Sequence, residues 1–137
     1  MAKFENSNFE IYEKTGKKAQ VLASVSYPSG RLAITEGAVR HFGLDKAKYV
    51  MLMYDRAKNI IGLKFFETKS QPNMTKLMFR KDSGCYIMAA NFFKNFGISL
   101  PAAANFFELR QDEKLQGVYT FNLNEATERR YGGRKKK

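Results

Sequence analysis

The chain of 137 residues contains the same pattern twice, and this repeat constrains its fold more than any other feature. Residues 29–44 read SGRLAITEGAVRHFGL and residues 83–98 read SGCYIMAANFFKNFGI, so the Ser-Gly and Phe-Gly pairs match at a constant offset. Each copy is followed by an apolar run, a polar turn and a second run that contains a glycine, Gly62 or Gly117. Because an internal repeat sets the architecture, the sequence predicts two fused ββαββ units, a pseudo-dimer.

Local signals place the elements of the first copy. Residues 20–27 alternate between apolar and small polar side chains, which is typical of a half-buried strand, and Pro28 and Gly30 predict the turn that follows. Thr35 is a favourable N-cap and Gly43 a favourable C′ residue for a short helix between them. A returning strand is expected at 31–34, a hairpin at 49–54 and 60–66, and a first edge strand at 9–13.

The second copy predicts strands at 76–80 and 85–88, a helix at 91–96 and a hairpin at 104–110 and 115–123. The chain therefore divides into a first unit (9–67), a linker (68–75), a second, degenerate unit (76–123) and a basic disordered tail (124–137). Neither unit alone buries both faces of its sheet. We expect a β-rich α+β fold in which the two units form an interlocked or closed small β-barrel, with the short helices outside.

The formal net charge of +11 favours a polyanionic partner, and nucleic acid is the leading class. Basic residues gather at 14–18, at 64–81 and at the end of the chain. The terminal sequence RRYGGRKKK predicts salt-sensitive contacts to phosphates that carry no sequence information. These tail residues are Arg129, Arg130, Arg134, Lys135, Lys136 and Lys137.

From Gly30 onward the chain resembles the AbrB/MazE/SpoVT swapped-hairpin DNA-binding domains. The family pattern runs Gly-Arg, two apolar residues, Ile-Pro-Lys, a short helix with an arginine, and Leu-Gly-Ile, followed by two strands. Residues 50–55 and 60–64 fit the two closing strands, and residues 76–123 repeat the pattern only in degenerate form. The residues that fit the helical part are Gly30, Arg31, Ile34, Arg40, Gly43 and Leu44, with Phe42 at the leucine position.

The resemblance implies a double-stranded DNA-binding protein with a transcriptional or plasmid/phage regulatory role, in which Arg31 reaches a base edge. The first copy departs from the pattern at two places, where Thr35-Glu36 stands for Pro-Lys and Ala47-Lys48 stands for the usual Gly-Asp after the helix. In the second copy Cys85 stands at the position of the arginine. The implied contacts of the first unit are Lys14, Lys17, Lys18, Arg31 and Arg40, and those of the second are Lys76, Arg80 and Lys81.

Two other functions stay open at this point. Single-stranded DNA or RNA is held by a basic groove with exposed rings, and the aromatic content supplies candidate rings at Tyr27, Tyr49, Tyr54, Phe65, Phe66, Phe79 and Tyr86. The Phe pairs at 65–66, 92–93 and 106–107 also suit a structural, adaptor or antitoxin-like module, or a homo-oligomer, if some of these rings form an exposed patch.

Enzymatic activity has little support in the sequence. His41 and Cys85 are the only histidine and cysteine, so the usual zinc ligand sets cannot be assembled. No nucleophile–base spacing and no glycine-rich phosphate loop is present, and we expect no catalytic residue, cofactor or metal. No apolar run is long enough to span a membrane and none resembles a signal peptide, so a cytoplasmic, nucleoid-associated location is expected.

Overall fold

The computed structural model describes residues 20–131 except 70 and 82. These residues form a β-rich α+β fold, which confirms the class predicted from the sequence. The helices are α1 (Glu36–Phe42) and α2 (Ala90–Phe96). The strands are β1 (Leu22–Ser26), β2 (Arg31–Ile34), β3 (Tyr49–Asp55), β4 (Ile60–Phe66), β5 (Met74–Lys76), β6 (Met78–Arg80), β7 (Gly84–Met88), β8 (Ala103–Glu108), β9 (Arg110–Gln111), β10 (Val118–Asn122) and β11 (Ala126–Tyr131).

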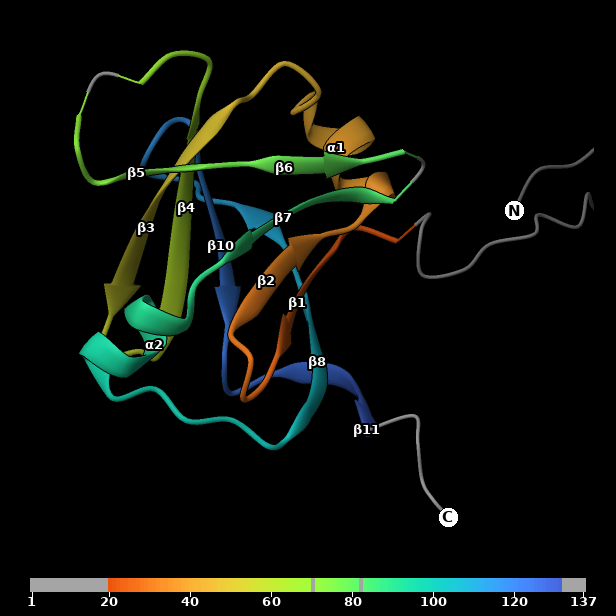
Figure 1. Ribbon diagram of the computed structural model, residues 1–137, viewed down its shortest axis with the longest axis vertical. Coiled ribbons are helices and arrows are strands. Elements are labelled where there is room, and N and C mark those ends of the chain that lie inside the picture. Colours follow the sequence, from red (N-terminus) through yellow and green to blue (C-terminus); the bar gives the residue numbers. More distant parts are fainter. Residues whose placement is uncertain (1–19, 70, 82, 132–137) are drawn as a thin grey trace, which may run out of the picture.

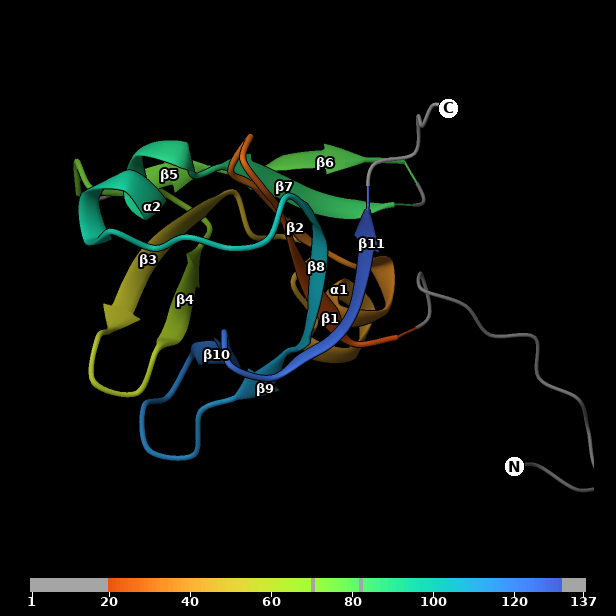
Figure 2. The same cartoon turned by 90° about the horizontal axis from the view of Figure 1, so that it is seen from below.

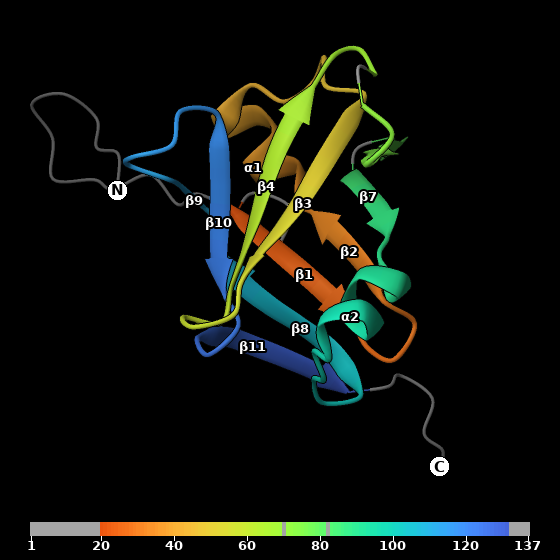
Figure 3. The same cartoon turned by 90° about the vertical axis from the view of Figure 1, so that its left-hand side faces the viewer.

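The strands form two antiparallel sheets that lie one in front of the other in Figure 3. One sheet has six strands in the order β11-β8-β1-β2-β7-β6, and the other has five in the order β5-β3-β4-β10-β9. The two helices lie at opposite ends of this pair of sheets (Figure 1). The molecule is therefore a pair of sheets and not the closed barrel that the repeat suggested.

Two segments of the chain contribute to both sheets. Residues 74–80 form β5 in one sheet and β6 in the other, and residues 103–111 form β8 and then β9. In Figure 2 the first segment lies along the top of the view, and the second runs down from β8 to β9. Each segment breaks at one leucine, Leu77 or Leu109, and both are buried. A strand that bends at a buried residue can leave one sheet and enter the next, which forms a corner between two sheets.

Strands from the two copies of the repeat pair with each other in both sheets. The four residues of β2 pair with residues 85–88 of β7, which occupy the matching positions of the second copy. In the same way β4 pairs with β10, and β1 pairs with β8. The two copies therefore share both sheets and one hydrophobic core, in which Phe93, Phe107 and Phe121 are the largest fully buried side chains.

The hairpin glycines hold the copies together at close range. Gly30 and Gly84 both have positive φ, of 81° and 80°, and each lies against the N-terminus of the helix in the other copy. The Ala89 amide donates to the Gly30 carbonyl at 2.7 Å, and the Gly84 amide donates to the Glu36 carboxylate at 3.0 Å. Such an approach leaves no room for a side chain at either glycine.

The strands after these glycines are out of phase by one residue. In β2 Arg31 is half-buried and Leu32 is buried, whereas in β7 Cys85 is buried and Tyr86 is half-buried. Arg31 and Cys85 match in the sequence repeat, but they face opposite sides of the sheet. Cys85 therefore faces the core, and the side chain that β7 directs outward near Arg31 is Tyr86.

The capping predictions for α1 are confirmed. The Thr35 hydroxyl accepts a hydrogen bond from the Ala38 amide at 3.3 Å, and Gly43 closes the helix in the left-handed conformation. In the second copy Ala89 occupies the N-cap position of α2 and makes no side-chain cap hydrogen bond. The matching glycine, Gly97, again ends the helix.

Several boundaries predicted from the sequence are wrong. Residues 126–131 are strand β11 of the six-stranded sheet and not part of a disordered tail. Their pairing with β8 supplies the backbone hydrogen bonds that a charged sequence alone does not indicate. The linker ends earlier than predicted because β5 begins at Met74, and Leu77 interrupts the strand predicted over 76–80.

The predicted edge strand at 9–13 and the last residues of the predicted tail, 132–137, lie outside the described residues. Among the residues that the structure does describe, neither helix has the length and apolar character needed to cross a membrane.

We predict that Gly84→Ala destabilises the protein far more than Gly97→Ala. Both glycines have positive φ, but a Cβ at Gly84 would lie 2.0 Å from the Ile34 carbonyl oxygen, whereas nothing lies within 4 Å of one at Gly97. Gly97→Ala should cost about 1 kcal/mol from backbone strain, and Gly84→Ala should cost at least ~3 kcal/mol or prevent folding. Urea denaturation measures both, and equal losses would contradict the close packing.

Candidate nucleic-acid interface

The outward side of the six-stranded sheet carries a band of cationic, aromatic and small side chains, which we call the outer face. Two rows of paired residues cross the strands. The first row is Met88, Arg31, Ser26, Ala104 and Arg130. The second row is Met78, Tyr86, Ala33, Ser24, Phe106 and Glu128, and Arg80 lies beside its Tyr86 end. The alternate residues of the four central strands are buried against the core.

Two arginines converge on one ring of the outer face. The guanidinium carbon of Arg31, on β2, lies 4.1 Å from the centre of the Tyr86 ring, and that of Arg80, on β6, lies 4.8 Å from it. Since β2 and β6 flank β7, the two cations approach Tyr86 from the strands on either side. Stacking on a ring orients a guanidinium while its N–H donors remain directed outward.

Arg31, Arg80 and Tyr86 form a group that we call the Tyr86 cluster. Its arginines have no carboxylate partner among residues 20–131, with 70 and 82 left aside. The ion pairs within that range join Arg40 to Glu36, Arg110 to Glu108, and Arg130 to Glu128. Arg31 and Arg80 are in none of them. Two cations held close together on a ring, with no carboxylate paired to either of them in that range, form a ready site for an external anion such as a phosphate.

A second cation–aromatic contact lies across the sheet. The guanidinium carbon of Arg130 is 5.8 Å from the centre of the Phe106 ring, and Arg130 also donates to the Glu128 carboxylate at 3.0 Å. Between Phe106 and the Tyr86 cluster, the described residues of the outer face have small side chains, at Ser24, Ser26, Ala33 and Ala104. The two cation–aromatic contacts are therefore separated by a stretch of small side chains on β2 and β1.

The structure brings some of the predicted contact residues together and separates others. Arg31, Arg80 and Arg130 share the outer face. Lys76 is exposed on β5 of the other sheet, and Lys81 is exposed in the turn between β6 and β7. Arg40 is exposed on α1 and bonds to Glu36 at 3.1 Å, one helical turn away. Lys14, Lys17, Lys18, Arg134, Lys135, Lys136 and Lys137 lie outside the described residues.

Arg129, which the sequence analysis assigned to the basic tail, makes a structural contact within the six-stranded sheet. Asn105 is fully buried, and its amide nitrogen donates to carbonyl oxygens of Val25, Pro101 and Ala103 at 3.1–3.2 Å. Its amide oxygen accepts from the Arg129 Nε at 2.7 Å. Arg129 thereby satisfies a buried acceptor and anchors β11 to β8, which explains why this charged segment is a strand.

Cys85 lies on the core side of β7, below the outer face. Burial, together with the negative charge of Glu36, raises the pKa of its thiol to about 12. In the described part of the chain, no group of three or more histidine, cysteine, aspartate or glutamate residues is placed to hold a metal ion.

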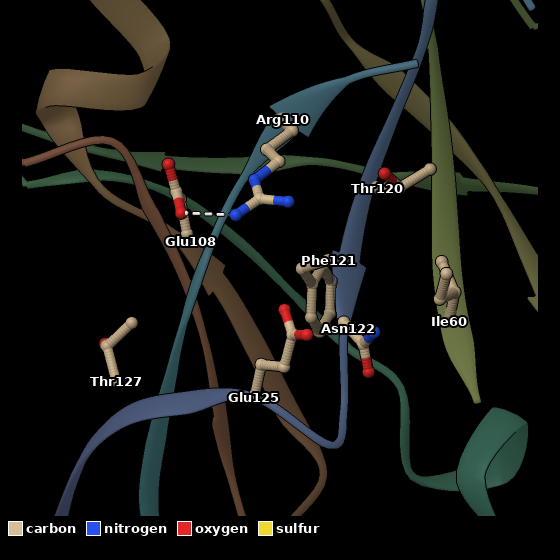
Figure 4. A pocket seen from close by; sticks show the side chains of 8 residues that line it. All are labelled: Ile60, Glu108, Arg110, Thr120, Phe121, Asn122, Glu125 and Thr127. Atoms are coloured by element: carbon tan, nitrogen blue, oxygen red, sulfur yellow. Dashed lines mark hydrogen bonds and ion pairs between the residues drawn. The ribbon is translucent and has the colours of Figure 1, made fainter. Parts of the chain in front are cut away.

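A hollow of about 270 Å³ lies where the two sheets meet, beside β9 and β10. Figure 4 shows Glu108 paired with Arg110 on one side of it, and Glu125 on the side of β11. Two carboxylates and one guanidinium line this hollow, so its charge is unfavourable for a polyanion. It is therefore not part of the candidate interface.

The sequence analysis named Tyr86 as a candidate ring for base stacking but did not include Phe106 among those rings. In each of the Phe pairs at 92–93 and 106–107 the second ring is buried and the first is half-buried. The sequence analysis did not predict that Met78 (47% exposed) and Met88 (57% exposed) lie on the surface beside Tyr86. The alternation of buried and exposed residues along β7 could have placed Met88 outward together with Tyr86, and the turn predicted between 76–80 and 85–88 could have placed β6 beside them.

No family model matches this chain, and no curated protein or solved structure is similar enough to match it. The function therefore has to be inferred from the chain's own side chains.

We predict that Arg129→Ala lowers the free energy of unfolding by ~1–3 kcal/mol, because it leaves the buried Asn105 oxygen without its donor. Arg130→Ala is the matched control. It removes an exposed ion pair on the neighbouring residue and should cost less than ~0.5 kcal/mol. Urea denaturation distinguishes the two, and equal costs would show that the Asn105 contact does not stabilise β11.

We also predict that Cys85 is inert in the folded protein. A pKa raised from 9.0 to about 12 leaves on the order of a thousandfold fewer thiolates at pH 8, and the thiolate is the nucleophile. Ellman's reagent at pH 8 should label the urea-unfolded chain at once and the native chain only as fast as it unfolds. Rapid labelling of native protein would show that the thiol is accessible.

Proposed function

We propose that this protein binds nucleic acid through the outer face of its six-stranded sheet and is not an enzyme. The observation that carries the proposal is the convergence of Arg31 and Arg80 on Tyr86. Neither arginine has an ion-pair partner in the described part of the chain, so no ion pair within that part has to break before either one bonds a phosphate oxygen. The aromatic ring adds a surface on which a base can stack.

The charge of the whole chain supports the same class of ligand. A formal net charge of +11 attracts a polyanion over long range and raises its local concentration. The basic residues that precede β1 and follow β11 belong to the same chain and add phosphate contacts that depend on salt. We propose no contact between the ligand and the acidic hollow beside β9 and β10.

We predict that Arg31→Ala and Arg80→Ala each weaken nucleic-acid binding by about tenfold, since each removes a charge-assisted hydrogen bond. Each change should also reduce the slope of log affinity against log salt by about 0.7–0.9. Fluorescence anisotropy with labelled oligonucleotides over a salt series measures both effects.

Arg40→Ala is the matched control, because Arg40 is an exposed arginine that is already paired with Glu36 on α1. Its affinity and salt slope should stay close to those of the unchanged protein. A truncation after Tyr131 tests the terminal basic residues without removing any of β11. If Arg31→Ala and Arg80→Ala bind as tightly as the unchanged protein, the outer face is not the binding site.

A further inference from the structure

We infer that the ligand of the outer face is single-stranded nucleic acid, which crosses the sheet from the Tyr86 cluster to Phe106. The inference rests on the proposed function and specifies its ligand. It replaces the double-stranded DNA that the swapped-hairpin resemblance implied. Three observations carry it: the breadth of the face, the distance between its two cation–aromatic contacts, and the side chains around Tyr86.

The breadth of the face is unfavourable for reading an undistorted duplex. Six strands with ~4.8 Å between neighbours span about 24 Å. The major groove of B-form DNA is ~12 Å wide, so this sheet cannot enter it face-on. Arg31 lies on β2, with two or more strands on either side, and therefore cannot reach base edges that lie inside a groove. A single strand has no groove and exposes its bases directly.

The spacing of the two aromatic contacts suits a short single strand. Tyr86 on β7 and Phe106 on β8 lie in one row, three strand intervals apart, or about 14 Å. A stacked strand rises ~3.4 Å per nucleotide, so this distance corresponds to roughly four nucleotides. The intervening Ala33 and Ser24 are small and half-buried, so the side chains of this row leave room for a strand between the two rings.

The surroundings of Tyr86 favour a base more than a phosphate alone. Met78 and Met88 are paired neighbours of the Tyr86–Arg31 region, and both are exposed apolar side chains. The backbone of a duplex would place charged phosphates against these methionines, and burial of apolar surface against phosphates does not stabilise the complex. A stacked base covers apolar surface, and its phosphate can still bond Arg31 or Arg80.

The test compares binding of labelled (dT)12, (rU)12 and a mixed-sequence 12-bp DNA duplex by anisotropy near physiological salt. Tyr86→Leu and Phe106→Leu each remove a ring while retaining apolar volume, and each should weaken single-strand binding roughly 5- to 150-fold. Phe66→Leu is the matched control, because Phe66 is a half-buried ring with a cation, Lys64, 5.7 Å from its centre on the other sheet. Circular dichroism verifies that each variant is folded.

Single-strand binding at least tenfold tighter than duplex binding, lost in Tyr86→Leu and Phe106→Leu but kept in Phe66→Leu, is the expected result. Comparable binding of (dT)12 and (rU)12 would show that stacking and phosphates dominate, and a preference for one identifies the natural strand. Duplex binding as tight as single-strand binding, with Arg31→Ala still harmful, would overturn this inference and leave the proposed function standing. No binding to any of the three probes would overturn both.

Discussion

The fold depends on the antiparallel ladder between β2 and β7, where the two copies of the repeat meet. Four residues of β2 pair with the matching four residues of β7, and this ladder joins the halves of the six-stranded sheet. The ladder is flanked by two glycines, and each lies so close to the other copy's helix that any side chain would overlap its backbone. Gly30 and Gly84 therefore set how the copies interlock, and the positions of β1, β6 and β8 follow from that junction.

The same junction creates the outer face. Because the strands after the glycines are one residue out of phase, Arg31 and Tyr86 both face outward, whereas Cys85 faces the core. If the two copies were in phase, residues 31 and 85 would face the same side of the sheet, either both outward or both toward the core. The degenerate copy instead presents a ring beside the arginine of the first copy, and β6 adds Arg80 from the opposite side. A cation–aromatic site thus forms from segments that are distant in the sequence.

Much of the secondary structure could be predicted because its signals are local. Pro28, Gly30, Thr35 and Gly43 mark a turn and both helix ends, and the structure agrees with each. The breaks at Leu77 and Leu109 could not be predicted, since they depend on which sheet lies nearby. Nor could β11, which is held by a bond from Arg129 to a buried asparagine on another strand. Of the candidate site, Arg31, Arg80 and Tyr86 were identified individually from the sequence, but their convergence depends on strand order.

The most direct test of the outer face uses the methyl groups of the methionines as reporters. Met78 and Met88 are exposed beside Tyr86, whereas Met51, Met53 and Met74 lie in the other sheet. In a titration of methyl-labelled protein with (dT)12 followed by NMR, the resonances of Met78 and Met88 should shift and those of the other three should stay in place. Shifts confined to Met51, Met53 and Met74, or no shift at saturating oligonucleotide, would contradict the account.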